Sequence, residues 1–97
     1  MTSDQDIEPE IIFSDLSCGL EVDGHWLEVE IYCSDQDPGW ILEVINKFGT
    51  STVADDPFIA DGLAWRQFES WVKDEGLTAF MSDDDKKKLV NSSAHKA

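Results

Sequence analysis

An Asp-Gly pair at positions 23 and 24 is the sequence feature that most constrains the fold. A two-residue type I′ turn needs a positive φ at both of its central residues, and Asp-Gly is one of the dipeptides that tolerate this geometry. Shortly after the pair, residues 27–31 (LEVEI) alternate strictly between apolar and acidic side chains, which is typical of a strand with one wet face. The sequence therefore predicts a β-hairpin that turns at Asp23 and Gly24.

The position of this turn determines which residues face one another across the hairpin. Counting outward from the turn gives the pairs Val22 with His25, Glu21 with Trp26, Leu20 with Leu27 and Cys18 with Val29. Side chains alternate between the two faces of a strand, so one face gathers apolar residues. These are Leu20, Val22, Leu27, Val29 and Ile31. The other face carries Glu21, Trp26, Glu28, Glu30 and Tyr32.

Two further strands are expected after the hairpin. Residues 35–39 (DQDPG) form a break. Residues 40–46 (WILEVIN) then place apolar side chains on both faces of a strand, which indicates a central strand of the sheet. A turn at residues 47–49 precedes residues 50–54 (TSTVA), whose β-branched content is typical of a short strand. Because every connection is short, an antiparallel meander of about four strands is the simplest topology.

The hydrophobic period then changes to that of a helix. Residues 55–57 (DDP) are typical of a helix start, since a carboxylate can cap free amides and proline fits the first helical position. An apolar stripe at helical spacing follows, formed by Ala64, Phe68, Trp71 and Val72, with Trp65 at its edge. We expect a helix over residues 57–75 that ends at Gly76, although Asp61 could equally cap a helix beginning one turn later. Packed on the apolar hairpin face, the helix gives a two-layer α+β domain.

Three segments are expected along the chain. Residues 1–10 are an acidic, polar leader, predicted to be disordered, and residues 11–81 form the single α+β domain. Residues 82–97 form a charged tail, predicted to be mostly disordered. Residues 77–81 could either join the sheet or pack beneath the helix, and the sequence leaves both possibilities open.

The charge balance restricts the classes of partner. The chain carries 21 Asp and Glu against 7 Lys and Arg, a net charge of −14, which speaks against direct contact with nucleic-acid phosphates or anionic lipid. Residues 86–97 hold four of the lysines and no acid, so the rest of the chain is more acidic still. The first residues lack the positive charge and apolar stretch of a signal peptide, and we expect a cytoplasmic protein without a membrane span.

The sequence offers no strong metal site and no cofactor motif. Residues 35–39 resemble the start of an EF-hand loop, but Gly39 falls at the fifth position instead of the sixth, and the twelfth is Asn46 instead of Glu. Residues 83–85 are three consecutive aspartates, for which a solvated charge run is the simpler interpretation. We therefore expect neither a metal nor a cofactor.

Catalytic chemistry is not expected either. Neither Cys18 nor Cys33 has a neighbouring base in sequence, and the register places Cys33 opposite Ser14, too far from Cys18 for a disulfide. Reduced, partly buried thiols are the expected state. His25 flanks the hairpin turn, and the sequence has no nucleophile elbow, Walker loop or dinucleotide fingerprint. We expect a protein that is not an enzyme.

The outer hairpin face remains as the candidate for function. Glu28 and Glu30 lie on one face with Cα atoms about 6.5–7 Å apart, close to the spacing of phosphates along a nucleic-acid strand. The hypothesis is a monomer or weak dimer that binds a basic protein surface, in its sharpest form as a nucleic-acid mimic that inhibits a nucleic-acid-binding protein. The candidate residues are Glu21, Trp26, Glu28, Glu30 and Tyr32. Alternating glutamates that only keep an exposed sheet face soluble are the competing interpretation.

A second hypothesis belongs to a different class of protein. It is a small-ligand-binding or catalytic domain with a pocket between sheet and helix, lined by Trp40, Trp65 and Trp71. Core packing is the simpler role for these three indoles.

Three strings resemble a small family of uncharacterised bacterial α+β proteins with the same order of strands, turn and helix. They are residues 39–44 (GWILEV), 49–53 (GTSTV) and 55–58 (DDPF). The resemblance covers residues 11–77, and its motifs are structural. It implies an α+β fold and transfers no activity and no functional residue.

Overall fold

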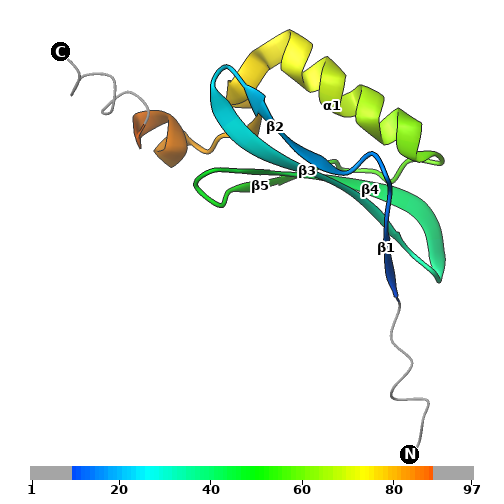
Figure 1. Cartoon of the computed structure of the whole chain (residues 1–97). Helices are drawn as coiled ribbons and strands as arrows, with labels where there is room; N and C mark the ends of the chain where they lie inside the picture. The colour runs from blue at the N-terminus through cyan, green and yellow to red at the C-terminus, as the bar shows by residue number, and fades with distance from the viewer. Residues whose placement is uncertain (1–9, 89–97) are drawn as a thin grey trace, which may run out of the picture.

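An antiparallel sheet with one long helix across a single face makes up the protein (Figure 1). This computed structural model describes residues 10–88. The strands are β1 (Ile11–Phe13), β2 (Cys18–Val22), β3 (His25–Ser34), β4 (Asp37–Asn46) and β5 (Ser51–Val53). They are followed by helix α1 (Asp61–Glu75) and the 3₁₀ helix η2 (Gly76–Phe80). The predicted two-layer α+β architecture is confirmed.

The β2–β3 hairpin has the predicted register. Asp23 and Gly24 have φ angles of 53° and 81°, so both central residues occupy the positive-φ region that the turn requires. The four predicted pairs are all observed, from Val22 with His25 to Cys18 with Val29. The alternation therefore places the apolar residues of β3 on the same side as α1, as expected.

The edge of the sheet beside β3 is interrupted. β1 and β2 pair with the same edge of β3, and residues 14–17 between them face only two residues of that strand. Ser17 fills the gap, because its Oγ atom accepts a hydrogen bond from the Ile31 amide (3.0 Å) and donates one to the Ile31 carbonyl (3.1 Å). The Ser14 amide also donates to the Ile31 carbonyl at 2.8 Å, so what the Ser17 side chain supplies is an acceptor for the Ile31 amide.

This interruption corrects the register predicted further along the edge. Cys33 lies opposite Ile12 and not opposite Ser14, because the insertion shifts β1 by two residues. Both cysteines are free, with Cys33 buried and Cys18 exposed rather than partly buried. Ser14 is itself buried, and its hydroxyl donates a 2.7 Å hydrogen bond to Asp61 at the start of α1.

The core lies between α1 and the sheet. It consists of Leu27, Val29, Ile31, Leu42, Val44, Ala64, Phe68, Leu77 and Phe80. Phe80 is fully buried, and the centroid of its ring lies 5.5 Å from that of Phe68 and 5.9 Å from that of Trp71. The segment that contains Phe80 packs beneath the helix instead of joining the sheet, which decides between the two possibilities for residues 77–81.

The helix begins at Asp61, so of the two expected starts the one at residue 57 is wrong and the later one is nearer. Phe58 exchanges two 2.8 Å backbone hydrogen bonds with Trp40, which keeps the chain extended just where the helix was expected to start. Helix α1 starts at Asp61, with Ala60 as its N-cap, so the acids at 55 and 56 cap nothing. Gly76 ends the helix with a φ of 67°, as predicted.

Residues 83–88, within the charged tail predicted to be mostly disordered, are helical. Ser82 and Asp85 form a capping box: the Ser82 hydroxyl accepts from the Asp85 amide, and the Asp85 carboxylate accepts from the Ser82 amide, both at 3.1 Å. The rest of the predicted tail, residues 89–97, and residues 1–9 of the predicted leader lie outside the described residues.

A buried polar network ties this helical segment to the β4–β5 turn. Asp85 is only 3% exposed and accepts hydrogen bonds from Thr50 Oγ1 (2.6 Å) and Asn46 Nδ2 (3.0 Å). Asn46 Nδ2 also donates to the Phe80 carbonyl at 2.7 Å. The Thr50 hydroxyl, followed by the Asn46 amide, holds the pKa of the Asp85 carboxyl well below its usual range.

Asp85→Asn is expected to release the helical segment. Loss of the charge weakens the hydrogen bonds from Thr50 and Asn46, so amides of residues 83–88 should exchange with solvent about tenfold faster. Hydrogen exchange followed by mass spectrometry measures this. The wild-type segment should stay protected at a pH where ordinary aspartates protonate, and lose protection only when the pH falls through the lowered pKa. Asp84→Asn, at an exposed neighbouring position, is the control; equal exchange in both variants would contradict the proposed anchor.

Candidate interaction surface

Figure 1 shows the face of the sheet turned away from α1, called the open face below. Strand pairing places on it the five side chains singled out by the sequence analysis. Glu21 comes from β2, and the other four come from β3. Trp26 is 47% exposed and Glu28 is exposed, whereas Glu30 and Tyr32 are half-buried. The hairpin therefore brings all five together on one surface.

Strand pairing adds residues that the sequence analysis did not include. Glu43 of β4 lies directly opposite Glu30, and Val53 of β5 lies opposite Glu43. Phe13 of β1 lies opposite Tyr32, with a distance of 5.8 Å between the ring centroids. Glu43 lies on the same side of its strand as Ile41 and Ile45, and only the pairing with β3 shows that this side belongs to the open face. The places of Phe13 and Val53 likewise depended on pairings that the sequence did not specify.

Trp26 is held flat against the sheet. Its indole covers Gly19 of β2, where any Cβ atom would collide with the ring. The indole Nε1–H donates a 2.7 Å hydrogen bond to Glu28 Oε2. An exposed aromatic ring is thus fixed in place before any partner arrives, which lowers the conformational entropy lost on binding.

Tyr32 and Glu43 form a second fixed pair. The Tyr32 hydroxyl donates to Glu43 Oε1 at 2.9 Å, and Ser51 Oγ donates to Glu43 Oε2 at 2.5 Å. Burial of the phenol, together with the negative charges of Glu43 and Glu30, raises the pKa of Tyr32 to about 12. The carboxylate of Glu43 is therefore oriented by two hydroxyl groups on neighbouring strands.

The pKa of Tyr32 can be measured directly, because this is the only tyrosine in the chain. An ultraviolet absorbance titration should give a pKa of about 12 instead of the ordinary 10.0. Since the unfolded phenol ionises first, the free energy of unfolding should fall as the pH rises between these two values. Glu43→Gln should lower the pKa, and Glu28→Gln should leave it unchanged. A wild-type value near 10 would contradict the Tyr32–Glu43 contact.

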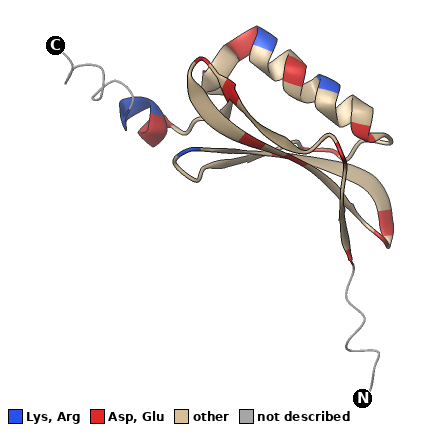
Figure 2. Cartoon of the chain, viewed as in Figure 1, with Lys and Arg blue, Asp and Glu red and all other residues tan. Residues whose placement is uncertain are grey.

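The open face has carboxylates but no cations on its strands. From position 10 to position 46 the sequence has nine Asp and Glu and no Lys or Arg. Figure 2 shows the basic residues of the described chain in the turn after β4, on α1 and in the last helical segment. Glu30 and Glu43 are like charges directly opposite each other, an arrangement that destabilises a sheet unless a cation from elsewhere compensates it.

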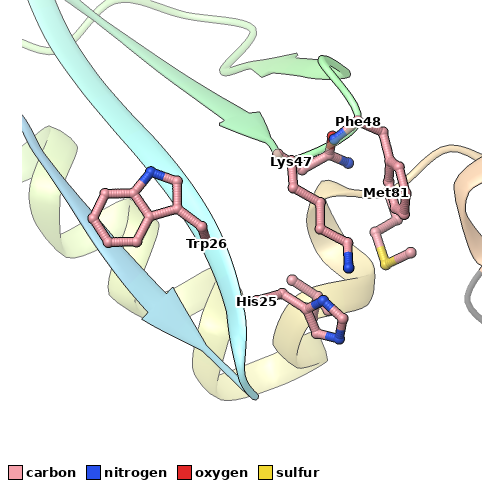
Figure 3. A pocket seen from close by; sticks show the side chains of 7 residues that line it. His25, Trp26, Lys47, Phe48 and Met81 are labelled. Atoms are coloured by element: carbon pink, nitrogen blue, oxygen red, sulfur yellow. The ribbon is translucent and has the colours of Figure 1, made fainter.

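Cavities lie beside His25 and on either side of α1. The cavity beside His25, shown in Figure 3 with Lys47 and Met81 at its rim, has a volume of about 10 Å³, enough for roughly one water molecule. Within residues 10–88, no group of three or more His, Cys, Asp and Glu side chains is placed to hold a metal ion. Trp65 and Trp71 line two different cavities, of about 260 and 290 Å³, on opposite sides of α1.

Comparison with known proteins adds no assignment. No family model, no curated protein and no solved structure matches the chain. The resemblance to a bacterial α+β family stays a prediction. None of the helices in the described part of the chain has the length and apolar composition needed to cross a membrane. The open face is therefore the feature from which a function can be argued.

Proposed function

We propose that the protein is a non-enzymatic acidic interaction module whose open face binds a basic protein surface. The observation that carries this proposal is a sheet face with four glutamates and no lysine or arginine on its described strands. The glutamates are Glu21, Glu28, Glu30 and Glu43. Two of these carboxylates are held by hydrogen bonds from Trp26 and Tyr32, so charge and aromatic surface are fixed side by side.

Such a face suits a basic partner for physical reasons. Complementary charge steers the encounter and rejects acidic surfaces, whereas a fixed aromatic ring supplies the buried contact that most often dominates binding energy. The Trp26 ring is exposed, and Glu28 beside it would meet a cation of the partner. The module therefore has both a source of specificity and an anchor.

The sharpest form of the proposal is nucleic-acid mimicry. Glu28 and Glu30 are spaced along β3 by about 6.5–7 Å, like successive phosphates, and Glu43 adds a carboxylate on the neighbouring strand. The partner would then be a cytoplasmic nucleic-acid-binding protein, which the module inhibits by occupying its basic groove. The module itself would act as a monomer and would contact no nucleic acid.

Affinity capture on the immobilised full-length chain tests this function. Extract of the source cell is applied at about 0.1 M salt and eluted at about 1 M, which shortens the Debye length from about 10 Å to about 3 Å. We expect the captured proteins to carry clustered Lys and Arg and to be released at high salt. Retention that is indifferent to salt, or partners without basic surfaces, would contradict the proposal.

A further inference from the structure

The open face is apolar as well as acidic. Phe13, Trp26 and Val53 are 55%, 47% and 49% exposed, respectively, and two isoleucines of β4, at positions 41 and 45, are half-buried on the same face. Ile11 extends the patch along β1 with 50% of its surface exposed. These apolar residues come from β1, β3, β4 and β5 and have carboxylates among them. Exposed apolar residues gathered on one face mark an interaction site more often than single scattered ones do.

The apolar and acidic residues of the open face lie in rows across the strands. One row contains Phe13, Tyr32 and Ile41, and the next contains Glu30, Glu43 and Val53. A third row pairs Glu28 with Ile45. A binding partner on this face must therefore offer apolar side chains and, beside them, basic side chains that can pair with the carboxylates of Glu30 and Glu43.

The shape of the face favours a helix over an added strand. The exposed apolar residues come from β1, β3 and β5. A strand added at either edge of the sheet would therefore lie beside the exposed residues of only one of these three strands. The four strand positions across the sheet span about 14 Å, at roughly 4.8 Å per strand, and a helix with its side chains is about 10–12 Å wide. Helix α1 already packs in this way on the other face of β3 and β4 (Figure 1).

The charge of the face selects a basic helix. A second copy of the chain would bring the same glutamates against one another, because a symmetric pair uses one patch on both molecules. We infer that the open face binds a basic amphipathic helix of a partner protein, whose apolar stripe contacts Phe13, Trp26 and Val53 and whose Lys or Arg side chains reach Glu30 and Glu43. This inference rests on the proposed function and names the partner segment.

Two synthetic peptides of identical composition test the inference. Both contain leucine and lysine and are about 18 residues long, roughly five helical turns; one gathers its leucines in a stripe and the other scatters them. Calorimetric titration of the full chain should give about tenfold tighter binding of the striped peptide. Phe13→Ser and Val53→Ser should each weaken its binding by several-fold, with circular dichroism to confirm folding.

Ile12→Ser is the matched control. Ile12 lies between Ile11 and Phe13 and is 44% exposed, but it pairs with buried Cys33 and so faces the other side of the sheet. Its replacement should leave peptide binding unchanged.

The possible failures separate the inference from the proposed function. Equal, salt-sensitive binding of both peptides would overturn the helix inference while leaving an acidic binding face in place. An equal loss in the Ile12 and Phe13 variants would also overturn it. If neither peptide binds, the inference is overturned, and the proposed function then depends on whether the capture experiment retains basic proteins.

Discussion

Replacing Phe80 by alanine is expected to lower the free energy of unfolding by about 3–5 kcal/mol. The side chain is fully buried, and its ring packs against Phe68 and Trp71 where η2 passes beneath α1. Alanine would leave a cavity that three different elements border, and the 3₁₀ segment has few other buried side chains with which to close it. Chemical denaturation followed by tryptophan fluorescence measures the loss.

Two other replacements calibrate that result. Trp71→Ala should destabilise the protein less than Phe80→Ala, because Trp71 is only half-buried. Its place in the apolar stripe of the helix had suggested full burial. Leu63→Ala, at a position on α1 that is 41% exposed, should change stability by less than about 0.5 kcal/mol. A Phe80→Ala loss no larger than that of Leu63→Ala would contradict the position of η2 in the core.

Reversing two charges on the open face is expected to abolish partner binding. In the double variant Glu28→Lys, Glu30→Lys, attraction to a basic surface becomes repulsion, and affinity should fall by at least about a hundredfold. Folding should survive, because Glu28 is exposed and a lysine at position 30 would face Glu43 as an opposite charge. Binding of a captured partner, measured by calorimetry, gives the affinity.

The control for this variant changes net charge by the same amount elsewhere. Asp55 and Asp56 are exposed and follow β5, off the open face. Asp55→Lys, Asp56→Lys should therefore keep most of the affinity. Equal losses in the two double variants would mean that binding depends on overall charge and that the open face has no special role.

Local signals predicted most of the sheet. Asp23 and Gly24 specify both a turn and a register through backbone geometry that few other dipeptides accept, and strict alternation confirmed which side of β3 faces the core. The hairpin alone therefore placed Trp26, Glu28 and Tyr32 on one surface. These features depend on residues close in sequence, which is why they could be predicted.

The features that sequence analysis missed depend on distant contacts. Phe58 stays extended because it pairs with Trp40, and this pairing overrides the helix-start signal of the preceding Asp-Asp-Pro. Asp85 looked like part of a solvated charge run, but Thr50 and Asn46 surround its carboxylate with donors. The spacing of Ser82 and Asp85 is a local capping-box signal, but it does not predict the donors from Thr50 and Asn46 that bury the carboxylate.

The two extra residues on the edge beside β3 decide which side chains of β1 lie on the open face. Side chains change face at every residue, so an insertion with an even number of residues leaves Phe13 on the same side as Gly19. Removing a single residue from positions 14–17 would turn Ile12 outward and send Phe13 to the side of the helix. The set of side chains on the open face is thus encoded partly by the length of a short loop: inserting or deleting two residues preserves that set, and inserting or deleting one changes it.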